Sequence, residues 1–190
     1  ATVTGTMSGY TEREVKLRVE GAEAARAALA EIGARPLRPR RLQADVVFDT
    51  PDRDLMLRGD VLRVRSEDGA HCLTFKSPLP HATMKLREEL ETSVSDGRLL
   101  MTIFERLGFA PSFRYEKYRE EFSVSDVVVA IDETPVGTFI EIEGSAEGII
   151  AVTLALGRQP SEFVLDSYRS LFLQACAAAG TPATDMLFAR

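Results

Sequence analysis

The stretch TEREVKLRVE, residues 11–20, alternates charged and apolar side chains. Successive side chains of a β-strand point to opposite faces of a sheet. One face of such a strand then carries Glu12, Glu14, Lys16, Arg18 and Glu20. The other face carries Val15, Leu17 and Val19. The charged face is either ordinary solvated surface or the wall of a site.

The same alternation recurs in the other extended segments of the chain. Their charged or polar faces carry, segment by segment, Arg63 and Arg65; Thr74 and Lys76; Lys85, Arg87, Glu89 and Glu91; Tyr115, Lys117, Arg119 and Glu121; Asp132; and Glu141 and Glu143. The spacing Glu-x-Glu occurs three times on these faces, at Glu12/Glu14, Glu89/Glu91 and Glu141/Glu143. Acidic and basic side chains are therefore mixed along nearly every strand.

Patterning and turn residues predict an α+β fold with seven or eight mostly antiparallel strands. A closed barrel or strongly curved sheet is the economical arrangement, because closure removes exposed strand edges. The glycine-bearing turn at residues 68–69 predicts a β-hairpin. We expect strands at about 10–20, 41–49, 61–67, 71–78, 83–94 and 112–124, and two more around 135–137. We expect helices at 21–33, 95–109 with Ser95 as N-cap, 146–157, and 167–180 ending at Gly180.

Two arrangements fit strands with one charged and one apolar face. In the first, the apolar faces form the core and the charged faces meet water, as in many antiparallel sheets. In the second, the sheet closes with its charged faces inward, and helices cover the apolar outer faces. The apolar helical segments, such as LLMTIFERLGF at 99–109, favour the second arrangement because they need an apolar surface.

Composition limits the classes of protein that the chain can belong to. It has 190 residues, 45% of them hydrophobic and 27% charged, which suits one globular domain. The net charge of −6 argues against nucleic acid as a partner. No apolar stretch reaches membrane-spanning length, so we expect no membrane association. The two cysteines have no metal-binding spacing and favour a cytoplasmic location. We expect a disordered leader over residues 1–9.

The chemistry of the charged faces points to a specific kind of ligand. Clustered carboxylates raise one another's pKa unless a cation intervenes, and Mg²⁺ and Mn²⁺ prefer oxygen ligands. Lysine and arginine cannot bind a metal and instead bind anions, arginine forking onto phosphate. A cavity that supplies both kinds of side chain suits a metal-chelated polyphosphate.

Glu12-x-Glu14-x-Lys16 resembles the signature of the CYTH superfamily, the triphosphate tunnel metalloenzymes that include class IV adenylate cyclase and thiamine triphosphatase. Further motifs follow in family order: LRVR, LTFKSP, REELE, EKYR, VAID, GTFIEIEG and SYRSLF, the last with Tyr168. The resemblance implies one domain over residues 10–190, an eight-stranded antiparallel closed barrel with a charged interior and surrounding helices. It implies Mg²⁺ or Mn²⁺ bound by Glu12, Glu14, Glu89, Asp132, Glu141 and Glu143. It implies phosphate binding by Lys16, Arg63, Arg65, Lys76, Arg87, Lys117 and Arg119, with Glu12, Glu14 and Lys16 catalytic.

Three activities fit this reading, and the partner in each is a small triphosphate such as tripolyphosphate, thiamine triphosphate or ATP. Attack by water on a terminal phosphorus gives a triphosphatase, which we favour because no adenine-reading signature is evident. Attack by the ribose 3′-hydroxyl of ATP gives a class IV adenylate cyclase. A non-catalytic triphosphate sensor is the third activity, although simple anion binding would not need so many carboxylates. A homodimer is compatible with the sequence, which does not fix the oligomeric state.

Overall fold

The computed structural model describes residues 8–80 and 83–189. Most of the expected leader, residues 1–7, lies outside them, and the first strand begins at Ser8. In chain order the elements are β1 (Ser8–Val19), α1 (Ala22–Glu31), β2 (Arg35–Asp49), α2 (Asp54–Arg58), β3 (Val61–Glu67), β4 (Ala70–Leu79), β5 (Lys85–Val94), α3 (Gly97–Arg106), β6 (Ala110–Val124), β7 (Val127–Thr134), β8 (Gly137–Glu143), α4 (Ala146–Ala155), a 3₁₀ turn (Pro160–Glu162) and α5 (Tyr168–Ala179).

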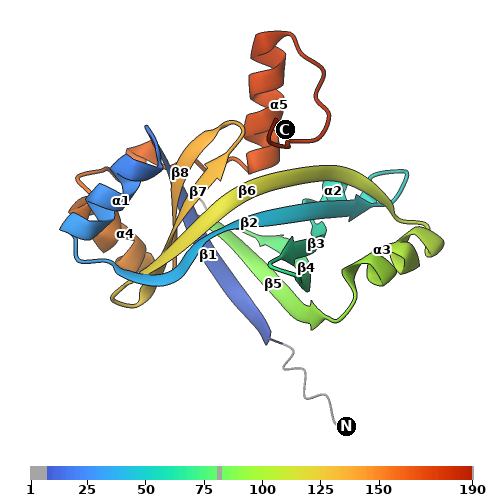
Figure 1. The fold of residues 1–190 in the computed structure, drawn as a ribbon, viewed down its shortest axis with the longest axis horizontal. Helices are drawn as coiled ribbons and strands as arrows, with labels where there is room; N and C mark the ends of the chain where they lie inside the picture. Colours follow the sequence, from blue (N-terminus) through green and yellow to red (C-terminus); the bar gives the residue numbers. More distant parts are fainter. Residues whose placement is uncertain (1–7, 81–82, 190) are drawn as a thin grey trace. The chain divides into compact units, whose positions relative to one another are not determined.

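The strands form a closed barrel in the order β1-β5-β4-β3-β2-β6-β7-β8 (Figure 1). This confirms the predicted α+β class and the eight-stranded antiparallel closed barrel. By their contacts the described residues form two compact units. The first contains the described residues up to Glu12, Gln43–Pro80 and Leu86–Tyr115, and the second contains the others.

The first unit contains the antiparallel sheet β2-β3-β4-β5. The predicted hairpin joins β3 to β4, with positive φ at Asp68 (48°) and Gly69 (80°), as a two-residue turn of this handedness requires. Helices α2 and α3 both contact β3. The aromatic ring of Phe104 on α3 packs edge-on against Phe48, with ring centroids 5.3 Å apart. Asp49, at the end of β2, begins α2 by accepting hydrogen bonds from the backbone N–H groups of Leu55 and Met56.

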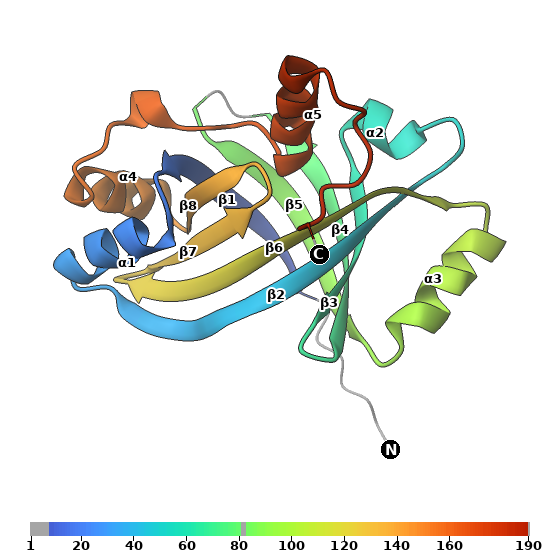
Figure 2. The same ribbon diagram turned by 45° about the horizontal axis from the view of Figure 1, so that its top comes forward.

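The second unit contains the antiparallel sheet β1-β8-β7-β6. Figures 1 and 2 show α1 and α4 side by side along this sheet, and contacts join α1 to β7 and α4 to β8. The core between the helices and the sheet consists of fully buried aliphatic side chains, which include Val15, Leu17, Leu29, Val129, Ile142 and Ile149. One face of this sheet is therefore apolar and covered by helices, as the inward-charge arrangement requires.

Strand β2 is longer than the sequence predicts. We expected it to start at about residue 41, after Pro36 and Pro39, but it begins at Arg35. Proline is excluded from a strand only where its neighbour needs a backbone N–H donor. The pairing of β2 with β3 starts at Gln43, so neither proline has to donate to β3.

Helix α3 differs from the prediction in its cap and in the face that it buries. Asp96, not Ser95, is the N-cap, and its carboxylate accepts a hydrogen bond from the backbone N–H of Leu99. Leu99, Ile103 and Leu107, whose spacing predicted the helix, are 58%, 45% and 69% exposed. A second apolar stripe, which includes Phe104, packs against the sheet instead. Helical periodicity does not tell which of two apolar stripes faces inward.

Candidate functional site

Lys16 lies among carboxylates on the charged face of the second unit's sheet. Its side chain is 2% exposed, and its Nζ is 3.3 Å from Glu14 Oε1 and 3.9 Å from Glu141 Oε2. The register places Lys16 directly opposite Glu141 on β8. Burial alone would lower the Lys16 pKa, but Glu14 and Glu141 outweigh it and raise the pKa. Lys16 is therefore a permanent buried cation at neutral pH.

Asp132 on β7 is a second carboxylate of this cluster and contacts four donor atoms. It is fully buried and accepts hydrogen bonds from Lys117 Nζ (2.9 Å), Arg119 Nε (2.7 Å), Arg119 Nη2 (2.6 Å) and Tyr168 Oη (2.8 Å). Burial works to raise its pKa, but Arg119 and Lys117 outweigh burial and hold the pKa well below the usual range. Both oxygens are occupied by donors, so a metal ion at Asp132 would have to displace some of them.

Arg119 contacts both Asp132 and Glu141. Its Nη2 also donates to Glu141 Oε1 at 2.5 Å. Burial would lower the Arg119 pKa, but Asp132 and Glu141 raise it well above the usual value. The ring of Tyr168 lies 5.4 Å from Lys16 Nζ and 5.3 Å from Lys117 Nζ. In the sequence, only the position of Tyr168 in the SYRSLF motif pointed to the site.

The other predicted metal-binding carboxylates of this sheet lie at the strand pair β1–β8. Glu14 lies directly opposite Glu143, a pairing of like charges that destabilises a sheet unless cations compensate. Lys85 supplies one such cation by donating from Nζ to Glu14 Oε1. Glu14, Glu141 and Glu143 are thus neighbours on β1 and β8 and offer the oxygen donors that Mg²⁺ and Mn²⁺ prefer.

The donor set fits a divalent metal in its chemistry but not in its present arrangement. Among residues 8–80 and 83–189, no three His, Cys, Asp or Glu side chains converge as metal ligands. Glu14 and Glu141 instead contact lysine and arginine. A metal bound with an anion would exchange these partners, because the anion attracts the cations and the metal attracts the carboxylates.

A comparable cluster of charges occupies the charged face of the first unit. Lys76 Nζ on β4 donates to both carboxylate oxygens of Glu12, at 2.6 and 2.7 Å, and lies 2.8 Å from Glu89 Oε2. Glu12 and Glu89 are 5% and 2% exposed. Two buried carboxylates from β1 and β5 therefore contact the same lysine of β4.

Arg63 and Arg65 of the same sheet both contact Asp45 of β2. Sequence reasoning missed Asp45, because a single aspartate in an extended run gives no signal of its own. The Nε atoms of Arg63 and of Arg87 on β5 are both buried with no hydrogen-bond partner among the described residues. The charge of Arg87 contributes to a lowered pKa of Asp60, for which the hydrogen bond from Ser77 is the largest cause.

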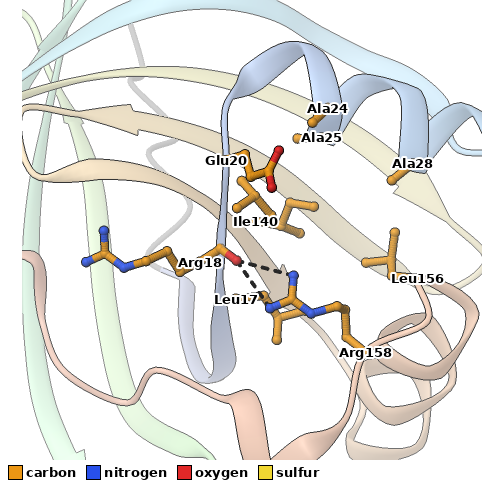
Figure 3. Close-up of a pocket in the computed structure, with 10 residues that line it drawn as sticks. Leu17, Arg18, Glu20, Ala24, Ala25, Ala28, Ile140, Leu156 and Arg158 are labelled. Carbon is orange, nitrogen blue, oxygen red and sulfur yellow. Dashed lines mark hydrogen bonds between the residues drawn. The ribbon is translucent and has the colours of Figure 1, made fainter.

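A groove of about 700 Å³ lies on the other, helical side of the second unit's sheet (Figure 3). Both guanidinium Nη atoms of Arg158 donate to the Arg18 carbonyl oxygen across it, at 3.2 and 3.3 Å. The groove contains none of the predicted site residues and is lined by Leu17, Arg18, Val19, Glu20, Ala24, Ala25, Ala28, Ile140, Leu156 and Arg158. Its largely apolar walls do not suit a triphosphate.

Comparison with known proteins identifies relatives and solved structures with the same fold. A protein of Methanocaldococcus jannaschii named "Putative adenylate cyclase" is 31% identical over 139 residues, which are 73% of this chain and 79% of that protein. The crystal structure of a Vibrio parahaemolyticus protein described by the same words has a TM-score of 0.75 at 20% identity and covers 86% of this chain and 98% of that one.

A Hippeastrum protein described as a "Putative adenylyl cyclase" that reveals a dominant triphosphatase activity has a TM-score of 0.65 at 20% identity. The match covers 90% of this chain and 97% of that one. At such identities the two solved structures show a shared fold. The CYTH domain model matches residues 11–156, most of the chain. The chain therefore belongs to the CYTH domain family.

Proposed function

We propose that this protein is a metal-dependent triphosphatase that hydrolyses inorganic or organic triphosphates. One observation carries the proposal: buried lysines and arginines share a sheet face with buried carboxylates, in each of the two units. Lys16, Lys117 and Arg119 gather around Asp132 and Glu141 in one unit. Burying so many charges costs free energy that a solely structural role does not explain.

In this proposal, phosphate oxygens are bound by the cationic side chains of Lys16, Arg63, Arg65, Lys76, Arg87, Lys117 and Arg119. Arg119 and Lys16 are fixed by carboxylates and would stabilise negative charge that develops on phosphate oxygens, without reorganisation during the reaction. The raised pKa of Lys16 keeps it protonated and suits it to charge stabilisation better than to proton abstraction. Water is the nucleophile, and its attack breaks the bond to a terminal phosphorus.

A divalent cation completes the proposal. Glu12, Glu14, Glu89, Glu141 and Glu143 supply hard oxygen donors for Mg²⁺ or Mn²⁺, and Asp132 does so only if its present donors withdraw. When bound, the metal would neutralise charge on the phosphate oxygens and orient the nucleophile. Which of the two metals the protein prefers stays a prediction, as do the individual metal ligands.

Adenylate cyclase activity is the second candidate, because the M. jannaschii relative is named for it. Cyclisation of ATP needs the same cations and carboxylates, and it also needs residues that bind the adenine base. The Hippeastrum protein, with the same fold and a dominant triphosphatase activity, supports the hydrolase as the main proposal. A sensor that binds a triphosphate without turnover is the third candidate.

Product identification separates the three candidates. The purified protein is incubated with tripolyphosphate, thiamine triphosphate or ATP in the presence of Mg²⁺ or Mn²⁺. We expect orthophosphate as a product. Cyclic AMP with pyrophosphate from ATP would establish the cyclase instead, and saturable binding without turnover would establish a sensor.

Other expectations are less closely connected to the site. No helix of the described residues has the length and apolar character needed to cross a bilayer. The cytoplasmic location, the single domain over residues 10–190, the absence of a nucleic-acid partner and the compatibility with a homodimer all stay predictions from the sequence.

A further inference from the structure

Asp45 connects two phosphate-binding candidates that lie two residues apart on β3. The register places Asp45 opposite Arg65, and its side chain has no solvent exposure. Arg65 donates from Nε to Oδ1 at 2.9 Å and from Nη2 to Oδ2 at 3.2 Å. Arg63 Nε lies 3.4 Å from the same Oδ1, an ion-pair contact without a hydrogen bond. One buried carboxylate therefore holds two guanidinium groups.

The remaining contacts fix Arg63 more firmly than Arg65. Arg63 donates from Nη1 to Tyr115 Oη at 3.3 Å and from Nη2 to Thr74 Oγ1 at 3.1 Å. The Nη1 group of Arg65 has no hydrogen-bond partner among the residues that the structure describes, and its side chain is 15% exposed. Nε and Nη2 of the Arg65 guanidinium thus contact Asp45, and Nη1 is left to contact an anion.

We propose that Asp45 is a positioning residue that holds Arg63 and Arg65 as one rigid phosphate-binding pair. The inference rests on the proposed triphosphate function. Without Asp45, the two arginines would repel each other and sample other rotamers, and ordering them on binding would cost affinity. Arginine suits this arrangement because its planar fork can meet a carboxylate with one edge and a phosphate with another.

The alternative is that Asp45 only offsets positive charge, and the two roles predict opposite effects of Asp45→Asn. The substitution adds one positive charge next to an anion site while keeping the side-chain volume. If Asp45 acted only through its charge, triphosphate would bind more tightly to the variant. If Asp45 positions the arginines, triphosphate binds more weakly despite the added charge.

The test is isothermal titration of tripolyphosphate with Mg²⁺ into wild type, Asp45→Asn and Asp49→Asn. Asp49 lies on the same strand and is also buried, but its carboxylate caps α2. We expect Asp45→Asn to weaken binding roughly tenfold, the loss of about one charge-assisted hydrogen bond. Asp49→Asn should lower the melting temperature and leave the affinity within about twofold. In hydrolysis assays KM should rise for Asp45→Asn more than kcat falls.

Two further variants keep the inference testable if Asp45→Asn folds poorly. Asp45→Glu keeps the charge but moves the carboxylate by one methylene, and we expect intermediate affinity. In an Arg65→Gln background, Asp45→Asn should cost less than in wild type, because one of the two arginines through which it acts is gone. Fully additive effects would contradict the positioning role.

The failure of the function and the failure of the inference give different results. If wild type binds none of tripolyphosphate, thiamine triphosphate and ATP, the proposed function is wrong. If wild type binds one of them and Asp45→Asn binds it equally well or better, the positioning role is wrong and the function stands.

Discussion

Replacing Asp132 by asparagine tests whether the buried cations depend on this carboxylate. The carboxylate accepts four hydrogen bonds, three of them from Lys117 and Arg119. Asparagine has the same shape but no charge, and its amide nitrogen would face cationic donors. Removing one partner of a buried ion pair costs roughly 3–5 kcal/mol. Arg119 keeps its contact with Glu141, so we expect a loss of about 3 kcal/mol, at the lower end of that range.

Urea unfolding followed by circular dichroism measures this loss. Asp126→Asn is the matched control, because Asp126 is exposed and accepts one hydrogen bond from Ser145; it should change the free energy of unfolding by no more than about 1 kcal/mol. A loss below about 1 kcal/mol for Asp132→Asn would refute the reasoning, since the buried cations would then not depend on their central carboxylate.

The same variant predicts a change in pH dependence. The Asp132 pKa is depressed in the folded protein, so its stabilising effect is fully present above the unfolded-state pKa of about 3.9. That effect is lost as the pH falls below this value toward the folded-state pKa. The stability difference between wild type and Asp132→Asn should therefore be constant near neutral pH and shrink below about pH 4. A difference that stays constant to pH 2 would contradict the depressed pKa.

Three further substitutions test separate parts of the account. Glu14→Gln should lower tripolyphosphate turnover at least about 100-fold and weaken Mn²⁺ binding in titration; wild-type turnover would remove Glu14 from the metal site. Gly144→Ala should cost about 2–3 kcal/mol of unfolding free energy, because Gly144 has φ of 152° and an added Cβ would lie 2.7 Å from Val127 Cγ1; a neutral effect would contradict this packing. Tyr168→Phe should cost about 1 kcal/mol through its hydrogen bond to Asp132, and a rise in KM without loss of stability would instead show that Tyr168 contacts substrate.

The side-chain alternation in the sequence predicted the strands and their charged faces, whereas the eight-stranded closed barrel with a charged interior was implied by the family resemblance. Alternation placed Lys16 and Glu141 on charged faces of different strands, and the structure aligns them as direct neighbours. It also placed Leu17 and Ile142 on the opposite, apolar faces, and both are fully buried. Alternation has a period of two residues, so it can be read from local sequence alone.

Contacts that depend on the register could not be predicted in this way. The role of Asp45 depends on its position opposite Arg65, and a shift of one residue would place it on the other face. Tyr168 reaches Asp132 from a helix 36 residues further along the chain. The exposure of Leu99, Ile103 and Leu107 on α3 could not be predicted from the sequence either, because the helix has two apolar stripes and either one could have packed against the sheet.

The most direct test of the central claim is phosphorus NMR of tripolyphosphate incubated with the purified protein, first with Mg²⁺ or Mn²⁺ and then with excess EDTA. The account predicts orthophosphate and diphosphate in the presence of metal and intact tripolyphosphate in EDTA. Tripolyphosphate that stays intact with either metal would contradict hydrolysis of inorganic triphosphate, and hydrolysis that continues unchanged in EDTA would contradict metal dependence.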